Sequence, residues 1–246
     1  MSQTADIVAL AAEPTQEAAG GVAGDISARL AGVGALTFAG TVFAQNLIRG
    51  AGSPTNGASP GEILAHYGHA SAIPFVLAAT YVLSGLGMAV FLGGALRQLL
   101  AGGQRGWAIT GVVGAVSIMA LFAVVVGAEQ ALGAVARTGT NSRPDVGAIQ
   151  AVWAIHNSVF TVLDFSIAVA LFGLARAGVA AGITPRAYRR LAPVGAGLLL
   201  IGTLAGPSIA EGDAMPLFGL TGVGFLVWLS FLVTTGLRLV RSGSAR

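Results

Sequence analysis

The chain has 246 residues, of which 54% are hydrophobic and only 9% charged, and its formal net charge is +3. Soluble domains carry about 25% charged residues, so this composition is typical of a protein surrounded largely by lipid. Cysteine and lysine are both absent, which excludes disulfides, thiolate metal sites, cysteine nucleophiles and lysine Schiff bases.

In chain order, residues 1–28 form an acidic, Ala/Gly-rich segment that we expect to be a disordered tail. It lacks the basic start and apolar core of a signal peptide. Six apolar runs then follow, each close to the roughly 20 residues that a spanning helix needs. They cover residues 30–48, 72–96, 107–128, 150–175, 191–209 and 217–239. The prediction is an all-α, polytopic integral membrane bundle of six transmembrane helices over residues 29–240, followed by a short tail at 241–246.

The arginines indicate how this bundle lies in its membrane. Ten of the thirteen fall before the first run, after the second, after the fourth or after the sixth, whereas Arg49, Arg137 and Arg143 fall on the other side. Because short cytoplasmic segments are enriched in basic residues, both termini are predicted to be cytoplasmic. The same distribution explains the pI near 10.2 without nucleic acid, so we expect a lipid bilayer and no nucleic-acid partner.

Small and aromatic residues suggest how the runs pack. Gly202 and Gly206, and likewise Ala28 and Gly32, have the spacing that lets membrane helices approach closely. Trp107 and Trp153 stand at the starts of spans and are expected to anchor them at the interface. Trp228 falls mid-span and is expected to be packed inside.

The fourth run, residues 150–175, carries polar groups at membrane depth, which is costly and often marks function. Asn157, Thr161 and Asp164 are spaced i, i+4 and i+7 and form one stripe, with His156 beside it. One interpretation is a hydrogen-bonded clamp from Asp164 to Tyr81, Ser84 or Ser117. The other is the lining of an outward-open cavity, in which Asp164 is either protonated or paired with His156.

Other polar residues collect on the same, non-cytoplasmic side. Gln45 and Asn46 end the first run, and Glu129 and Gln130 end the third. The predicted ligand- or proton-binding pocket therefore consists of Asp164, Asn157, His156, Thr161, Glu129, Gln130, Gln45 and Asn46.

A second set of residues could bind a metal. Glu62, His66 and His69 share one face of a short helix before the second run, and His156 could join them if that segment folds over the bundle. This set could hold a divalent metal, and a histidine pair including His156 could hold a haem.

Three stretches resemble a family of uncharacterised bacterial membrane proteins, a domain of unknown function. They are Arg29-Leu30-Ala31-Gly32, the long segment after Asn46, and TPRAYRRLAPVGAGLLLIG at 184–202. In the last of these, Pro185 and Pro193 approximate the family's proline-containing entry to a late helix, and the segment around Asp164 is similar to its aspartate-bearing helix. The resemblance implies a six-helix architecture in the inner membrane of a bacterium and carries no activity.

Three functional hypotheses follow. The first is a carrier or binding protein for a small molecule, ion or proton that uses Asp164, Asn157 and His156. The second is a membrane metal- or haem-binding redox protein or enzyme that uses His66, His69 and His156. The third is an accessory subunit, in a homo-oligomer or a membrane complex, whose polar groups only hold helices together. No catalytic motif is present that would decide whether the protein is an enzyme.

Overall fold

The computed structural model describes residues 16–69, 72–138, 145–211 and 215–242, and all regular structure in these ranges is α-helical. The helices are α1 (Gln16–Gly50), α2 (Pro60–His69), α3 (Ile73–Ala101), α4 (Arg105–Thr138), α5 (Val146–Ala180), α6 (Tyr188–Leu204), α7 (Gly206–Glu211) and α8 (Met215–Ser242). The predicted all-α class is confirmed. The predicted domain boundaries at residues 28 and 241 stay predictions.

Within the described ranges, five helices are long and apolar enough to cross a membrane: Ile26–Gly50, Ile73–Ala101, Arg105–Arg137, Val146–Ala180 and Gly219–Ser242. Large apolar side chains such as Phe75, Leu86 and Val113 are exposed on their outer faces, as expected where lipid is the solvent. These helices are compatible with an integral membrane protein and suggest a multi-pass one.

The fifth predicted span, residues 191–209, corresponds to α6, which has only 17 residues and is not among these five. At 1.5 Å per residue it is about 26 Å long, slightly less than the hydrocarbon core of about 30 Å. The short helix α7 follows it after Ala205. Six spans are therefore not confirmed, although α6 packs lengthwise against α5 and α8 like the longer helices.

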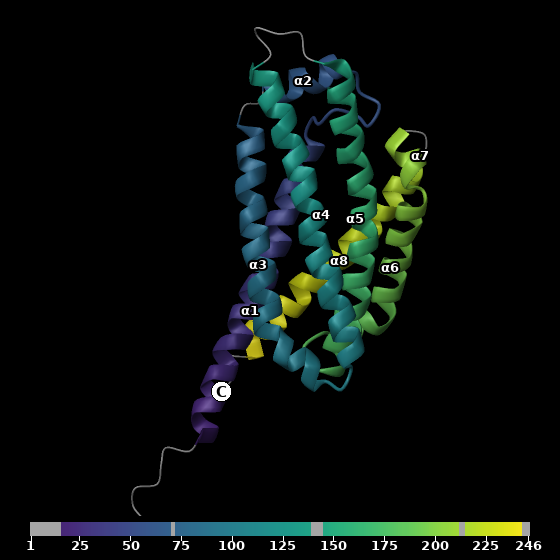
Figure 1. Cartoon of the computed structure of the whole chain (residues 1–246). Helices are drawn as coiled ribbons and strands as arrows, with labels where there is room; N and C mark the ends of the chain where they lie inside the picture. The colour runs from purple at the N-terminus through teal and green to yellow at the C-terminus, as the bar shows by residue number, and fades with distance from the viewer. Residues whose placement is uncertain (1–15, 70–71, 139–144, 212–214, 243–246) are drawn as a thin grey trace, which may run out of the picture.

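The contacts between the six longer helices close into a ring, and Figure 1 shows the bundle from the side, with α2 across one end. Neighbours in chain order pack against each other, from α1 with α3 to α6 with α8, and α8 packs against α1. Contacts pair the start of one helix with the end of the next: Ser27 in α1 bonds to Gly94 in α3, and Gly32 in α1 lies against Gly236 in α8. The start of α1 and the end of α8 therefore lie at one end of the bundle. We call the opposite end, which carries α2, the α2 end.

Glycines set the spacing between several of these helices. A Cβ added to Gly32 would lie 2.6 Å from the carbonyl oxygen of Gly236, and one added to Gly173 in α5 would lie 2.6 Å from the Cα of Gly111 in α4. Both distances are well below the 3.5–4.0 Å of a favourable carbon contact. The packing role predicted for Gly32 is confirmed, and Gly202 likewise lies against Thr221 of α8.

The structure confirms the predicted burial of Trp228 and contradicts the predicted position of Trp153. Trp228 is 1% exposed and contacts Phe38 edge-on at 6.4 Å, so its predicted burial is confirmed. Trp153 is only 5% exposed, so its assignment as an interface anchor is wrong. It is buried because α2 and the segment after α1 cover the end of α5, and its ring packs with Tyr67 and Ile63.

Helix α4 runs to Thr138, ten residues beyond the predicted end of the third span. Residues 129–138 contain no proline, and most are good helix formers. Leu132 from this extension packs with Ile63 and Tyr67 of α2. The extension explains why Glu129 is inside a helix and almost completely buried instead of at a wetted helix end.

Candidate functional site

A buried ion pair lies at the α2 end of the bundle interior. Arg49, in the last turn of α1, donates from Nε to Oε1 of Glu129 at 2.7 Å and from Nη2 to Oε2 at 2.9 Å. Their side chains are only 10% and 2% exposed. Two parallel bonds of this kind are stronger and more directional than a single charge contact. The Arg49 side chain therefore holds the Glu129 carboxylate in a fixed position between α1 and α4.

Aromatic rings and an amide complete the surroundings of Arg49. Its guanidinium carbon lies 5.1 Å from the centre of the Phe122 ring and 5.7 Å from that of Phe160, within the range of cation–π attraction. Its Nη1 also points to Oε1 of Gln45 at 3.4 Å. The positive charge is thus stabilised on several sides, with only 10% of the Arg49 side chain exposed.

His156 extends this network into α5. Its Nε2 lies 3.4 Å from Oε1 of Glu129, and its Nδ1 lies 2.9 Å from Oδ1 of Asn157. The ring of Trp153 stacks on the imidazole with centroids 4.7 Å apart and an angle of 7° between the planes. Both ring nitrogens of His156 therefore face oxygen acceptors, and the ring itself is held by an aromatic face.

The segment between α1 and α2 covers this network. Trp153 Nε1 donates to the carbonyl of Asn56 at 3.1 Å, and Asn157 Nδ2 donates to the same carbonyl at 3.3 Å. The side chain of Asn56 in turn donates to the carbonyl of Ile209 at 2.7 Å. These bonds fasten residues 50–59 across the end of the bundle, from α5 to α7.

Below the network is a cavity of about 1090 Å³ between α1, α4, α5 and α8. The six predicted pocket residues in its lining are Asn46, Glu129, His156, Asn157, Thr161 and Asp164. Its deeper walls are apolar, with Phe38, Ile118 and Trp228 among them. The predicted polar stripe of α5 thus lies along one wall of a cavity that is polar at the α2 end and apolar toward the middle.

Among the described residues of this lining, Asp164 is the acidic group besides Glu129. Its carboxylate makes no hydrogen bond or ion pair with any residue that the structure describes. The clamp interpretation is therefore contradicted, since Asp164 bonds to none of Tyr81, Ser84 and Ser117. Tyr81 donates to the carbonyl of Met119 at 3.1 Å, and Ser84 bonds to Thr41. Asp164 is eight residues after His156, which places it about 12 Å farther along α5.

Two predicted pocket residues lie outside the lining. Gln130 is exposed on the outer face of α4. Gln45 is fully buried and donates to Ser84 Oγ at 3.2 Å, so it joins α1 to α3 and supports Arg49 from behind. Both follow from helix geometry, since one residue of each predicted adjacent pair faces away from the cavity.

The residues predicted to bind a metal are placed on α2. Glu62 accepts bonds from the backbone N–H and the hydroxyl of Ser59, while Ser59 Oγ accepts from the Glu62 N–H, which is a capping box at the start of the helix. These bonds from Ser59 hold the pKa of Glu62 below its ordinary value.

His66 contacts the Tyr67 ring edge-on at 5.0 Å, and burial raises the pKa of the Tyr67 phenol. The side chain of His69 lies outside the described part of the structure. Among the side chains that are described, no three histidine or acidic groups gather as a metal site would require. The metal and haem assignments remain predictions.

Sequence reasoning missed Arg49 as a site residue. It was counted among the charges that flank the spans, because its position at the end of an apolar run is typical of such charges. A signal was present: Arg49 is four residues after Gln45, so both residues share a helix face.

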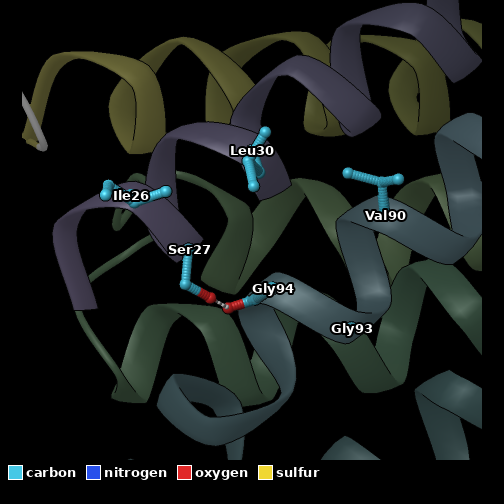
Figure 2. Close-up of a pocket in the computed structure, with 6 residues that line it drawn as sticks. All are labelled: Ile26, Ser27, Leu30, Val90, Gly93 and Gly94. Carbon is cyan, nitrogen blue, oxygen red and sulfur yellow. Dashed lines mark hydrogen bonds between the residues drawn. The ribbon is translucent and has the colours of Figure 1, made fainter. Parts of the chain in front are cut away.

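A smaller hollow of about 490 Å³ lies on the other half of the bundle, between α1 and α3 (Figure 2). It is lined by Ile26, Ser27, Leu30, Val90, Gly93 and Gly94. Ser27 Oγ donates to the carbonyl of Gly94 at 3.1 Å, the dashed bond in Figure 2. This lining holds no titratable side chain, so the hollow is a notch between closely packed small residues and offers no chemistry.

Comparisons with known proteins do not indicate a family or a function for the chain. No family model, curated protein or solved structure matches the chain. The resemblance to a family of uncharacterised bacterial membrane proteins therefore remains a prediction.

Proposed function

We propose that this protein binds a small molecule in the cavity between α1, α4, α5 and α8 and carries it across the membrane. The observation that supports this most is an unpartnered carboxylate, Asp164, in the lining of a cavity of about 1090 Å³. Ligand pockets of roughly 300–1,000 Å³ with mostly apolar walls and a few polar groups are the usual form of small-molecule sites. An ionisable group at membrane depth is a functional candidate for the same reason.

The two polar parts of the cavity have different roles in this proposal. The network of Arg49, Glu129 and His156 is already bonded within itself, so it gives the α2 end a fixed shape. Asp164 and Thr161 face the cavity farther along α5 and provide polar contacts for a ligand. The apolar walls bury the rest of the ligand.

The proposal includes a location and an orientation. The α2 end would face the non-cytoplasmic side of a plasma membrane, the inner membrane if the chain is bacterial, with both termini in the cytoplasm. Of the three arginines predicted on the α2 side, Arg49 is buried in an ion pair, which increases the asymmetry of exposed positive charge. In this arrangement α6 and α7 together provide the fifth of six crossings.

A variant that fills the cavity tests the proposal. Gly222 is an exposed residue of the cavity lining, and a Cβ at this position would meet no atom within 4 Å, so Gly222→Phe adds a ring at the cavity wall without displacing the backbone. Gly197→Phe is the matched control, because Gly197 also has open space around it and does not line the cavity.

Both variants and the wild-type protein are screened in lipid nanodiscs against a panel of small cations, anions and neutral amphiphiles, with thermal unfolding as the readout. At least one compound is expected to raise the unfolding temperature of the wild type and of Gly197→Phe but not that of Gly222→Phe. If no compound separates the two variants, the cavity is not a binding site. A compound that does is then loaded into liposomes containing the protein, and counterflow measures its transport.

A further inference from the structure

We infer that the ligand of this cavity is a lipophilic organic cation that enters from the bilayer. This inference rests on the proposed function and adds the chemical class of the ligand. Three features of the structure support it: the balance of charge in the cavity, the aromatic rings in its walls, and the place where its wall reaches the surface of the bundle.

The charge balance favours a cation. Arg49 is the one arginine among the described residues that line the cavity, and it makes both of its short bonds to Glu129. These two charges therefore neutralise each other. The carboxyl group of Asp164 has no such partner among the described residues. His156, whose ring nitrogens face Glu129 and Asn157, lies about 12 Å away along α5, so the charge of an ionised Asp164 has no positive group beside it. A bound cation would compensate this charge, and an anion would be repelled by it.

The aromatic walls favour a cation with a large apolar body. The rings of Phe38, Phe225 and Trp228 line the cavity in addition to Phe122 and Phe160, which already face Arg49. Aromatic faces attract organic cations, and this attraction is stronger where water is excluded. An ion such as Na⁺ would gain little from these walls, since it needs several oxygen ligands and the deeper cavity offers few.

The cavity also reaches the outer surface of the bundle. Phe43 and Leu47 on α1 and Val223 and Leu226 on α8 all line the cavity. Each is nonetheless about half exposed, between 48% and 58%. The two helices meet closely at Gly32 and Gly236, at the end of the bundle opposite to α2. Because α1 and α8 are joined at that end, a ligand dissolved in the bilayer would pass between their other halves.

The test compares two ions of the same shape and opposite charge. Binding of radiolabelled tetraphenylphosphonium and of tetraphenylborate is measured by equilibrium dialysis on the full chain in phosphatidylcholine nanodiscs, with empty nanodiscs subtracted. Tetraphenylphosphonium is expected to bind saturably and tetraphenylborate is not. Asp164→Asn should weaken tetraphenylphosphonium binding about tenfold or more, as expected for loss of a charged contact, whereas Asp164→Glu should retain it.

Asp145→Asn is the control. Asp145 is exposed and caps α5 from outside the cavity, and Asn caps a helix equally well, so this variant removes one negative charge and should bind as the wild type does. If tetraphenylborate binds as well as tetraphenylphosphonium, or Asp164→Asn binds unchanged, the cation class is wrong while the cavity remains a binding site. If neither ion binds, the cation class is also wrong, and the Gly222→Phe screen then decides whether the proposed function fails with it. Should Asp164→Asn not fold, the comparison of the two ions on the wild-type protein decides alone.

Discussion

Arg49 lies at the end of an apolar run, as arginines that flank a membrane span do, but its side chain is buried in an ion pair with Glu129. Both groups are almost completely buried, and removing two charges from water is costly unless geometry and further hydrogen bonds compensate. Here the compensation is visible: two short bonds between the partners, Gln45 behind Arg49 and His156 beside Glu129. Such a pair contributes a defined geometry more than net stability, and it becomes damaging when one partner is removed.

Removing either partner alone is therefore expected to destabilise the protein. Arg49→Met should lower the free energy of unfolding by about 3–5 kcal/mol, because it leaves the Glu129 carboxylate buried without its main partner. Combining Arg49→Met with Glu129→Gln should cost less than the sum of the two single changes, with a coupling of about 1 kcal/mol or more. Unfolding of purified protein in mixed micelles measures all three.

Arg137→Met is the control for this cycle. Arg137 lies over the Phe75 ring and is an exposed arginine on the same half of the bundle, so its replacement should change stability by about 0.5 kcal/mol or less. Strict additivity of the Arg49 and Glu129 changes would show that the two charges act independently.

At the scale of the helices, the packing of α4 against α5 determines the position of the cavity wall that these two helices form. In a bilayer the helices gain little from burying apolar side chains, so close backbone packing at small residues becomes the main attraction. Gly111 and Gly114 on α4 face Gly173 and Ala170 on α5 at distances that no larger side chain allows. The close approach at this end fixes the angle at which the polar ends of α4 and α5 present Glu129 and His156.

A single added methyl group at this contact is expected to separate the two helices. In Gly173→Ala the new Cβ would lie 2.6 Å from the Cα of Gly111. Because this neighbouring atom belongs to the backbone, it cannot rotate away as a side chain could. The expected loss is about 1–3 kcal/mol of unfolding free energy, as for other overpacked sites. Gly127→Ala, on α4 with nothing within 4 Å, should instead be neutral or about 0.5–1 kcal/mol more stable, since alanine favours helix. Equal effects of the two changes would mean that the contact does not limit the helix separation.

For the whole molecule, the apolar runs predicted the helices well because a backbone in lipid must satisfy its own hydrogen bonds. The arrangement of the helices was not predictable in the same way. Apolar residues face both lipid and protein, so hydropathy could not show that α8 closes the ring on α1 or that α4 continues past Ala128. The α5 stripe was recognisable by its spacing, whereas the ion pair of Arg49 with Glu129 was not: the spacing of Arg49 from Gln45 places both on one helix face but does not show whether that arginine turns inward or flanks the span.

The predicted orientation can be tested cleanly because the chain contains no cysteine. Single cysteines are introduced at Gly61, exposed at the start of α2, and at Gln104, exposed between α3 and α4 at the opposite end of the bundle. With the α2 end outside, a membrane-impermeant maleimide should label Gly61→Cys on intact cells, and it should label Gln104→Cys only after the cells are permeabilised. This follows from the arginine distribution, since translocating the end that carries ten of the thirteen arginines would be unfavourable. The reverse pattern would place the cavity network on the cytoplasmic side, and labelling of both positions from outside would mean that α3 does not span the membrane.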